Sequence, residues 1–289
     1  TKQVLELSSG KVDRYRNFNS KFVIPRTVDV WLPDNYSKDQ RYSVLYMHDG
    51  QMLFDSTTTW NKQEWGIDEV MGQLLKEQKI KQTIVVGIWN TKYRHSEYFP
   101  QKPFEQLPVS FQDSLIQFGE RNGKPGLFSA KISSDDYLSF VVTELKPFID
   151  STYSTHSEMD NTFIAGSSMG GLISMYAICE YPTIFGGAAC LSTHWTGTFE
   201  TEGNPIPAQF MHYLNAQLPD PENHKIYFDY GTATLDATYE PFQLQADSIL
   251  VSHGFGAGSW KSMKFEGHDH SERSWRERMD IPLRFLLEP

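Results

Sequence analysis

One serine in this sequence stands in a pattern that could make it a nucleophile. The stretch NTFIAGSSMGGLISMYA, residues 161–177, places Ser168 at the centre of Gly-x-Ser-x-Gly, with an apolar run before it and a helical pattern after it. A nucleophile in a sharp strand-to-helix turn needs small neighbours, because its backbone is strained and other segments approach closely. We therefore predict that Ser168, rather than Ser167, attacks a substrate. The alternative is a glycine-rich turn without chemistry.

A serine hydroxyl needs a base, and the sequence offers two histidines for this role. The acid and the base of such a serine follow it in later strand-to-helix loops. The segment KFEGHDHSERSW, residues 264–275, comes after the last expected strand and contains His268 and His270. Position alone does not choose between them. A metal site at this His-x-His is the weaker interpretation, because no companion ligands are evident, and we expect neither a metal nor an organic cofactor.

An acid that orients the base is expected in the loop after the preceding strand. The segment YFDYGTATLDATYEP, residues 227–241, contains Asp229, Asp236 and Glu240. Asp229 falls inside the strand pattern, whereas Asp236 lies in the loop, where a carboxylate can reach an imidazole. Glu240 falls in the first turn of the next helix, where its charge favours the helix dipole. We predict Asp236 as the acid, with Glu240 as the alternative; each could instead be a solvated or capping carboxylate.

Two backbone N–H groups are candidates for an oxyanion hole. The N–H of Met169 opens the helix after Ser168 and can stabilise a developing negative charge. The segment MHDGQMLF, residues 47–54, follows an early apolar strand, and its Gly50 permits a close backbone approach. We predict the N–H of Gln51 as the second donor. His48 and Asp49 precede the serine in the chain, and we interpret them as residues that organise this loop.

Apolar runs and amphipathic segments alternate along the whole chain. Such alternation predicts an α/β fold with a doubly wound, mostly parallel sheet, formed by one domain over residues 1–289. Strands are expected at 21–32, 42–50, 82–89, 162–166, 186–192, 224–231 and 259–267, and helices at 65–78, 133–149, 170–182, 240–254 and 274–287.

Two stretches interrupt this alternation, residues 91–131 and 194–208. The first is rich in proline and aromatic residues and shows little periodicity. We interpret both as insertions that shape the active face, the first as a lid or a binding wall. His95, His194 and Trp195 are the predicted substrate contacts within them. The alternative for each is a place in the local core or, for His95, in a solvated loop.

Composition narrows the class of partner. The 289 residues carry a net charge of −10, which argues against nucleic acid and against an anionic membrane. No apolar run approaches the roughly 18 residues of a membrane helix. Cys179 and Cys190 are expected as small core residues, with a disulfide between them as the lesser alternative. The sequence begins at Thr1 without a signal-like segment. A secreted or periplasmic protein whose leader was removed is one expectation, and the compartment stays open.

Several stretches together resemble the esterase family of α/β-hydrolases that includes esterase D, feruloyl and acetylxylan esterases, siderophore esterases and mycolyltransferases. They are VLYMHDGQMLFD, NTKYRHSEYFP, FIAGSSMGGLISMYA, YFDYGTATLDATYEPFQ and DHSERSWRERMDIPLRFLL. In that family the catalytic histidine commonly precedes a tryptophan by five residues, a spacing that His270 and Trp275 match. The resemblance thus implies His270 as the base and His268 as a neighbour or substrate contact. It also supports Asp236 as the acid and the N–H groups of Met169 and Gln51 as oxyanion donors.

These residues predict a serine esterase that works through an acyl-enzyme. The predicted substrate is a small-molecule or polysaccharide ester, with removal of acetyl or feruloyl groups from plant polysaccharide as the first choice. Hydrolysis of a siderophore ester is an alternative that a basic patch would favour. Acyl transfer to an alcohol, and a degenerate hydrolase fold used only for binding, are the others. The oligomeric state stays open.

Overall fold

An eight-stranded sheet forms the centre of the molecule. The computed structural model describes residues 5–121, 123–128 and 131–289, so residues 1–4 of the predicted domain and residues 122, 129 and 130 of the predicted 91–131 insertion lie outside the description. The strands of the sheet are β1 (Lys11–Phe18), β2 (Arg26–Leu32), β3 (Ser43–His48), β4 (Thr83–Ile88), β7 (Thr162–Ser167), β8 (Gly187–Leu191), β9 (Lys225–Gly231) and β10 (Trp260–Phe265).

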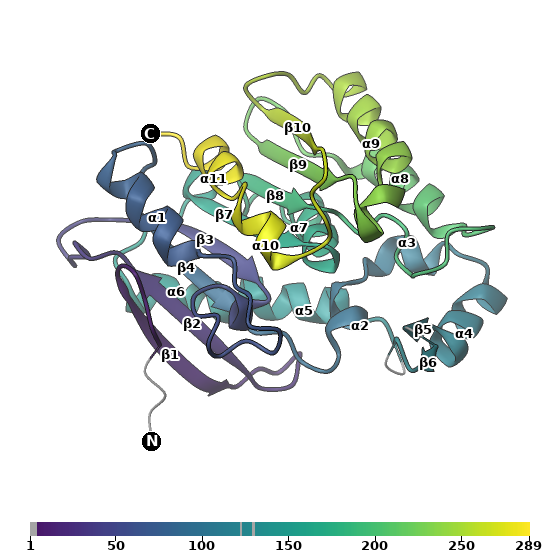
Figure 1. Cartoon of the computed structure of the whole chain (residues 1–289), viewed down its shortest axis with the longest axis horizontal. Coiled ribbons are helices and arrows are strands. Elements are labelled where there is room, and N and C mark those ends of the chain that lie inside the picture. Colours follow the sequence, from purple (N-terminus) through teal and green to yellow (C-terminus); the bar gives the residue numbers. More distant parts are fainter. Residues whose placement is uncertain (1–4, 122, 129–130) are drawn as a thin grey trace.

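The strands run mostly parallel, as predicted. Their order is β1-β2-β4-β3-β7-β8-β9-β10, with β1 and β2 at one edge and β10 at the other (Figure 1). The pairs β1–β2 and β2–β4 are antiparallel, and the pairs from β4 to β10 are parallel. In such a sheet the carboxyl ends of the parallel strands meet at one edge, where ligands bind in open α/β sheets. The loops after β3, β7, β9 and β10 therefore converge on one site.

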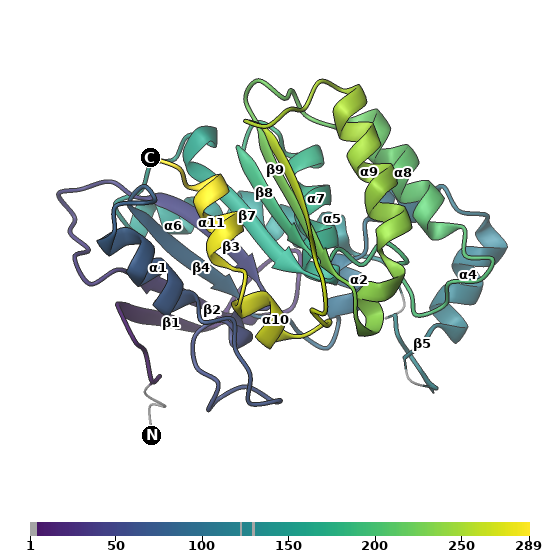
Figure 2. The ribbon, with the colours of Figure 1, turned by 45° about the horizontal axis from the view of Figure 1, so that its top comes forward.

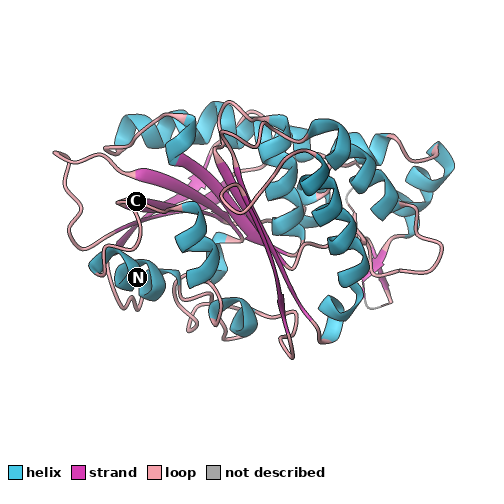
Figure 3. Cartoon of the chain, turned by 90° about the horizontal axis from the view of Figure 1, so that it is seen from above, coloured by secondary structure: helices cyan, strands magenta, loops and turns pink. Residues whose placement is uncertain are grey.

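Helices cover both faces of the sheet (Figures 2 and 3). Their bounds are α1 (Ile67–Lys76), α5 (Ser134–Phe140), α6 (Lys146–Thr152), α7 (Met169–Glu180), α8 (Ile206–Gln217), α9 (Glu240–Ser252), α10 (Glu272–Arg276) and α11 (Asp280–Leu286). Helices α1 and α11 contribute to the core on one face, and α5 to α9 contribute to the core on the other.

The central strands are apolar throughout because both of their faces are buried. Every residue of β3, β4 and β7 is buried. On β3, Tyr46 packs in the core beneath α7, whereas its neighbours Leu45 and Met47 pack in the core beneath α1. Side chains of a strand alternate between the two faces, so a strand covered on both sides appears as a continuous apolar run. This is why these strands were recognisable in the sequence.

The first predicted insertion is more regular than its sequence suggests. It contains α2 (Arg94–Tyr98), α3 (Gln101–Glu105), α4 (Val109–Phe118) and a small hairpin of β5 (Glu120–Arg121) and β6 (Lys124–Pro125). Pro100 and Pro108 immediately precede α3 and α4, so they begin helices instead of interrupting them. Figure 1 shows α4 and the hairpin at one end of the molecule, away from the sheet. Helices of five residues are too short for periodicity to reveal.

Several other boundaries also differ from the prediction. Strand β1 was not predicted, and α8 follows the irregular stretch 194–208 that the sequence suggested. The predicted helix 133–149 is formed by α5, a π-helical turn at Val141–Leu145 and α6. The predicted closing helix is divided into α10 and α11.

The two cysteines and the helices answer two further questions. Cys179 and Cys190 are both buried with free thiols, so the core interpretation is confirmed and the disulfide alternative is wrong. Within the described ranges, no helix combines the length and apolarity that crossing a bilayer requires.

Candidate active site

Ser168 occupies a strained position between β7 and α7. Its backbone has φ 58° and ψ −121°, a combination that non-glycine residues rarely adopt. Its N–H donates to the carbonyl of Leu191 at 2.8 Å, and its own carbonyl accepts from the N–H of His194 at 3.2 Å. These two bonds tie the turn to the end of β8. The strain is thus held by the surrounding backbone, as expected for a turn that presents a side chain outward.

The glycine two residues before Ser168 is required by the closeness of the chain. A Cβ built on Gly166 would lie 2.6 Å from the carbonyl carbon and from the oxygen of Gly170. Both atoms belong to the backbone of α7, so they cannot move aside without shifting the helix. The Gly-x-Ser-x-Gly pattern is therefore explained by packing at its first glycine.

We expect Gly166→Ala to destabilise the protein by roughly 1–3 kcal/mol, because overpacking against fixed backbone forces displacements. The matched control is Gly258→Ala, since a Cβ at Gly258 meets nothing within 4 Å. This control should leave stability nearly unchanged. Urea unfolding followed by circular dichroism measures both variants. Equal free energies of unfolding for the two would contradict the account of the turn.

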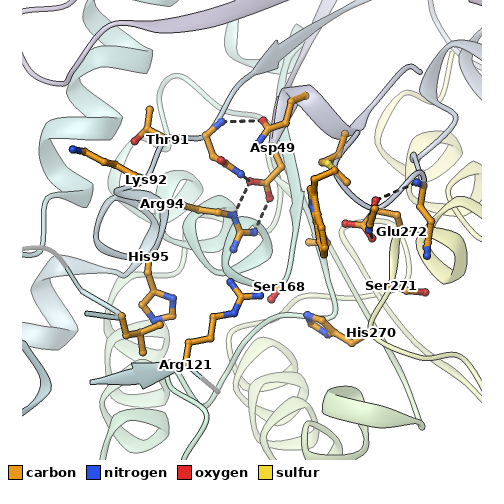
Figure 4. Close-up of a pocket in the computed structure, with 18 of the residues that line it drawn as sticks. Asp49, Thr91, Lys92, Arg94, His95, Arg121, Ser168, His270, Ser271 and Glu272 are labelled. Carbon is orange, nitrogen blue, oxygen red and sulfur yellow. Dashed lines mark hydrogen bonds and ion pairs between the residues drawn. The ribbon is translucent and has the colours of Figure 1, made fainter. Parts of the chain in front are cut away.

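Ser168 opens onto a cleft of about 840 Å³. Figure 4 shows Ser168 and His270 both pointing into this cleft, with Arg94, His95 and Arg121 on its other side. Gln51 also lines it. The predicted nucleophile, the predicted base and one predicted oxyanion donor therefore share one cavity, although they come from loops that are distant in sequence.

His270 is hydrogen-bonded to Asp236. The His270 Nδ1–Asp236 Oδ1 distance is 2.5 Å, and the Asp236 side chain is fully buried. A carboxylate at Nδ1 accepts the ring proton there and leaves Nε2 as the nitrogen that can accept a proton. Glu240, the alternative acid, contacts Lys264 at 3.0 Å and Tyr230 at 3.3 Å instead. Of the two candidate carboxylates, Asp236 is the one placed against the imidazole.

A network of donors holds Asp236 in its ionised form. Its Oδ2 accepts from the Ser192 hydroxyl and from the Gly231 N–H, both at 2.6 Å. Burial alone would raise the pKa of Asp236, but the hydrogen bond and charge of His270, together with these two donors, lower it below its ordinary value. Asp236 is thus prepared to accept a proton from His270 Nδ1 in a hydrogen bond without becoming neutral.

Residues behind Asp236 fix Ser192 in turn. The Ser192 hydroxyl accepts from Trp275 Nε1 at 3.0 Å and from Arg278 at 2.9 Å. Arg278 also pairs with Asp229 at 2.8 Å, and both side chains are buried. Asp229 therefore supports the site from within β9. Trp275, whose spacing from His270 carried the resemblance, acts through Ser192.

The predicted oxyanion donors lie at the starts of two helices. Met169 is the first residue of α7, and the first N–H groups of a helix have no partner within it. Gln51 lies in a short 3-10 helix (Gly50–Met52) after β3. A Cβ on Gly50 would lie 2.5 Å from the carbonyl carbon of Gly87, so only glycine lets this loop pack against β4. The side chain of Gln51 accepts from the N–H of Asn90 at 3.1 Å, which orients the segment.

His48 and Asp49 organise this loop. Asp49 has a left-handed backbone with φ 58° and binds Arg94 through two hydrogen bonds of 2.7 and 2.6 Å. Burial would raise the pKa of Asp49, but the charge and hydrogen bonds of Arg94 lower it below its ordinary value. The buried His48 ring contacts the Tyr137 hydroxyl at 2.8 Å, and burial is the main cause that lowers its pKa to about 3. His48 is therefore neutral at pH 7.

One of the predicted substrate contacts lines the cleft. His95 lies in the cleft wall, and its Nε2 is 2.9 Å from the carbonyl oxygen of Gly197. Burial lowers its pKa to about 3, so it presents a neutral ring. His194 is buried behind the turn, with Nδ1 2.6 Å from the Tyr239 hydroxyl and with its backbone N–H bonded to Ser168. It is not part of the cleft wall, so the prediction of a direct substrate contact is corrected.

Trp195 and His268 also lie away from the cleft. Trp195 is fully buried, donates to Gln243 at 2.9 Å and packs against Phe228. It belongs to the core because the loop after β8 turns inward at this point. The His268 ring lies beside Phe265 and 3.8 Å from a carboxylate oxygen of Glu277. Neither side chain is a substrate contact in this geometry.

A set of basic side chains in the cleft was not predicted. Lys92, Arg94, Arg121 and Lys124 line it, against the acidic side chains Asp49 and Glu272. Within residues 5–121, 123–128 and 131–289, Arg94 is the one of these four cations that forms an ion pair with a carboxylate. The cleft is therefore basic in a chain whose net charge is −10. The residues come from the segment 91–131, and only its folding brings them together.

The described residues offer no metal centre. Among them, no three or more His, Cys, Asp or Glu side chains are grouped so that they could hold a metal ion. The chemistry of the cleft thus has to be argued from its serine, imidazole, carboxylate and basic groups.

The strand order, the serine turn after β7 and the histidine after β10 define the α/β-hydrolase fold. A family model described as "Putative esterase" matches residues 21–113 and 125–284. The chain belongs to this esterase family.

Three known proteins show the range of its relatives. The uncharacterized protein YbbA of Bacillus subtilis is 25% identical over 188 residues, which are 64% of this chain and 62% of YbbA. The chain thus matches just under two thirds of that relative. A ferulic acid esterase of Anaeromyces mucronatus, solved with ferulic acid, has a TM-score of 0.61 and 16% identity, covering 99% of this chain and 94% of the other. The enterobactin esterase of Shigella flexneri has a TM-score of 0.63 and 18% identity, covering 98% and 60%. At these identities the solved structures show the fold.

Proposed function

We propose that this protein is a serine hydrolase of carboxylic esters that works through an acyl-enzyme. The observation that carries the proposal is the bond between His270 and the buried Asp236, in the same cleft as Ser168 on its strained turn. A nucleophile, a base and an acid that orients the base are the parts that such chemistry needs. Membership of the esterase family supports the same reaction class.

Each group has one role in this mechanism. His270 Nε2 removes the proton of Ser168 as its oxygen attacks the ester carbonyl, and the N–H groups of Met169 and Gln51 stabilise the oxyanion. His270 then gives the proton to the leaving alcohol, which departs and leaves an acyl-serine. A water molecule, deprotonated by His270, attacks this intermediate and releases the acid. Asp236 orients the imidazole and stabilises its charged form throughout.

We propose acetyl or feruloyl esters of plant polysaccharide as the first class of substrate. The likeness to a ferulic acid esterase supports this choice. A curated relative from Xylanibacter ruminicola points the same way. It is named "Endo-1,4-beta-xylanase/feruloyl esterase" and is 25% identical over 75% of this chain and 26% of its own length.

The basic lining favours a second candidate, hydrolysis of an anionic ester such as a siderophore. Lys92, Arg121 and Lys124 face the cleft without a carboxylate partner among the described residues. Such groups attract an anionic substrate and lower its KM. The enterobactin esterase among the solved relatives acts on an ester of this kind.

A panel of esters separates these candidates. The wild type and Ser168→Ala are compared on 4-nitrophenyl acetate, methyl ferulate, acetylated xylan and enterobactin. The first proposal expects turnover of ferulate or acetylxylan, and the second expects enterobactin to have the highest kcat/KM. Addition of glycerol tests acyl transfer, since an acylated glycerol would appear in place of free acid. Absence of turnover on every ester would contradict both proposals.

Replacing two of the basic residues tests the anionic candidate. We expect Arg121→Gln with Lys124→Gln to lower kcat/KM for an anionic ester about tenfold, since each exposed charge contributes up to about 1 kcal/mol. Activity on the neutral methyl ferulate should change much less. Lys38→Gln is the control, because Lys38 is exposed and lies away from the cleft. An equal loss on neutral and anionic esters would show that the two charges do not select the substrate.

A further inference from the structure

We propose that Trp60, Gln63 and Glu272 form a sugar-binding subsite on the leaving-alcohol side of the cleft. This inference rests on the proposed function, because it identifies the part of a polysaccharide ester that lies beyond the scissile bond. None of the three residues takes part in the proposed ester chemistry, and all three line the same cleft as Ser168 and His270.

Trp60 is exposed to an unusual degree for its size. Its exposed fraction is 81%, the highest among the large hydrophobic side chains of the described residues. Single exposed apolar residues are common on protein surfaces. An indole at the edge of a substrate cleft differs, because a ligand that enters the cleft can cover it. The binding of a flat apolar surface would remove this area from water.

The loop that carries Trp60 is fastened to the segment that follows His270. The Asn61 side chain donates to Glu272 at 2.8 Å, and the Gln63 side chain accepts from the N–H of Arg273 at 3.2 Å. A little further along, Glu64 pairs with Arg276 at 2.7 Å. These bonds join residues more than 200 positions apart in the chain. The position of Trp60 relative to His270 is therefore set by several polar contacts.

The core beneath this loop adds to the attachment. Trp65 is 1% exposed and lies 5.5 Å, between ring centroids, from Trp275, which in turn lies 5.1 Å from the His270 ring. A buried aromatic pair of this kind contributes packing energy beyond its area. The loop is thus anchored at its C-terminal end to the same tryptophan that supports Asp236 through Ser192.

Two polar groups beside Trp60 are free to bind hydroxyls. One oxygen of Glu272 accepts from Asn61, and the amide oxygen of Gln63 accepts from Arg273. In the part of the chain that the structure describes, the other Glu272 oxygen and the Gln63 amide nitrogen have no protein partner. A carboxylate oxygen accepts hydrogen bonds and an amide nitrogen donates them. Together they match the hydroxyl groups that surround a sugar ring.

The chemistry of a pyranose fits this arrangement. A sugar has an apolar face of C–H groups, which can stack on an indole, and a rim of hydroxyls, which can bond to the carboxylate and the amide. His270 gives its proton to the leaving alcohol, so the alcohol portion of the ester lies beside His270. The loop of Trp60 is attached two and three residues after His270. The geometry thus places the subsite next to the alcohol portion.

The test compares one acyl group on two alcohols. Feruloylated arabinoxylo-oligosaccharide carries a sugar chain beyond the ester, and methyl ferulate does not. We expect Trp60→Ala to lower the ratio of kcat/KM, oligosaccharide ester over methyl ester, about tenfold, mainly through KM, since an aromatic contact contributes up to about 1.5 kcal/mol. Trp60→Phe should restore most of the ratio. Phe22→Ala is the matched control, since Phe22 is an exposed aromatic outside the cleft.

Direct binding separates this inference from the proposed function. Ester-free arabinoxylo-oligosaccharide is titrated into Ser168→Ala by calorimetry, with and without Trp60→Ala. Binding that Trp60→Ala weakens about tenfold supports the subsite even if the wild type hydrolyses no ester. The inference is overturned if Trp60→Ala changes neither affinity nor the kcat/KM ratio. It is also overturned if both ferulates lose activity equally, because Trp60 would then contact the acyl group or shape the cleft.

Discussion

Ser168→Ala should lower kcat for ester hydrolysis by at least about 10⁴-fold, because removal of a nucleophilic serine eliminates the acyl-enzyme route. The residual rate would come from binding and the oxyanion hole alone. Folding should be preserved, since Ser168 forms no side-chain hydrogen bond with any other described residue and alanine is the smaller side chain. A 4-nitrophenyl acetate assay, with circular dichroism to confirm the fold, measures the effect.

The neighbouring serine gives the matched control for this prediction. Ser167 is the last residue of β7 and its side chain is buried, so it tests whether any serine in this turn suffices. Ser167→Ala should retain activity within about tenfold, as a small change in packing near the site. If Ser168→Ala kept wild-type activity, or if Ser167→Ala were the inactive variant, the assignment of the nucleophile would be wrong.

Asp236→Asn should lower kcat by about 10⁴-fold while leaving the protein folded at neutral pH. Asparagine is close in shape, but its amide cannot stabilise a charged imidazole and favours the wrong His270 tautomer. Asp236 accepts hydrogen bonds from His270, Ser192 and Gly231, so the substitution also turns an acceptor toward three donors. Glu240→Gln is the control, since Glu240 faces Lys264, and it should keep nearly full activity. Equal losses would contradict the choice of Asp236.

The pH dependence of stability tests the same carboxylate independently of any substrate. The folded protein lowers the pKa of Asp236, so the carboxylate favours folding above its unfolded pKa of about 3.9. That contribution is lost as the pH falls through the lower folded value. The free energy of unfolding in urea, measured between pH 7 and pH 3, should therefore decrease more in the wild type than in Asp236→Asn. A parallel decrease in both proteins would show that Asp236 is not a stabilised carboxylate.

The residues that the sequence predicted best are those at the ends of buried parallel strands. β7 and β9 are continuous apolar runs followed by turn residues, so Ser168 and Asp236 could be placed in loops at one edge of the sheet. The structure brings Asp236 and His270 into contact and places His270 in the cleft of Ser168. Local spacing did not choose between His268 and His270, and the choice came from the resemblance.

The residues that the sequence predicted poorly depend on contacts between distant loops. Trp195 turns into the core because Gln243 of α9 accepts its indole N–H, and no local pattern records that partner. The basic lining of the cleft arises when the hairpin that carries Arg121 and Lys124 folds toward the site. The attachment of the Trp60 loop to Glu272 joins residues far apart in the chain. Such placements are set by tertiary packing, which overrides local propensity.

The most direct test of the central claim is to identify the residue that becomes acylated. A fluorophosphonate reacts covalently with an activated serine, and mass spectrometry of the intact protein and its peptides then locates the label. We predict one label per chain on the peptide that contains Ser168, with no labelling of Ser168→Ala and greatly slowed labelling of Asp236→Asn. A label on another residue, or an unlabelled protein that still hydrolyses esters, would contradict the account.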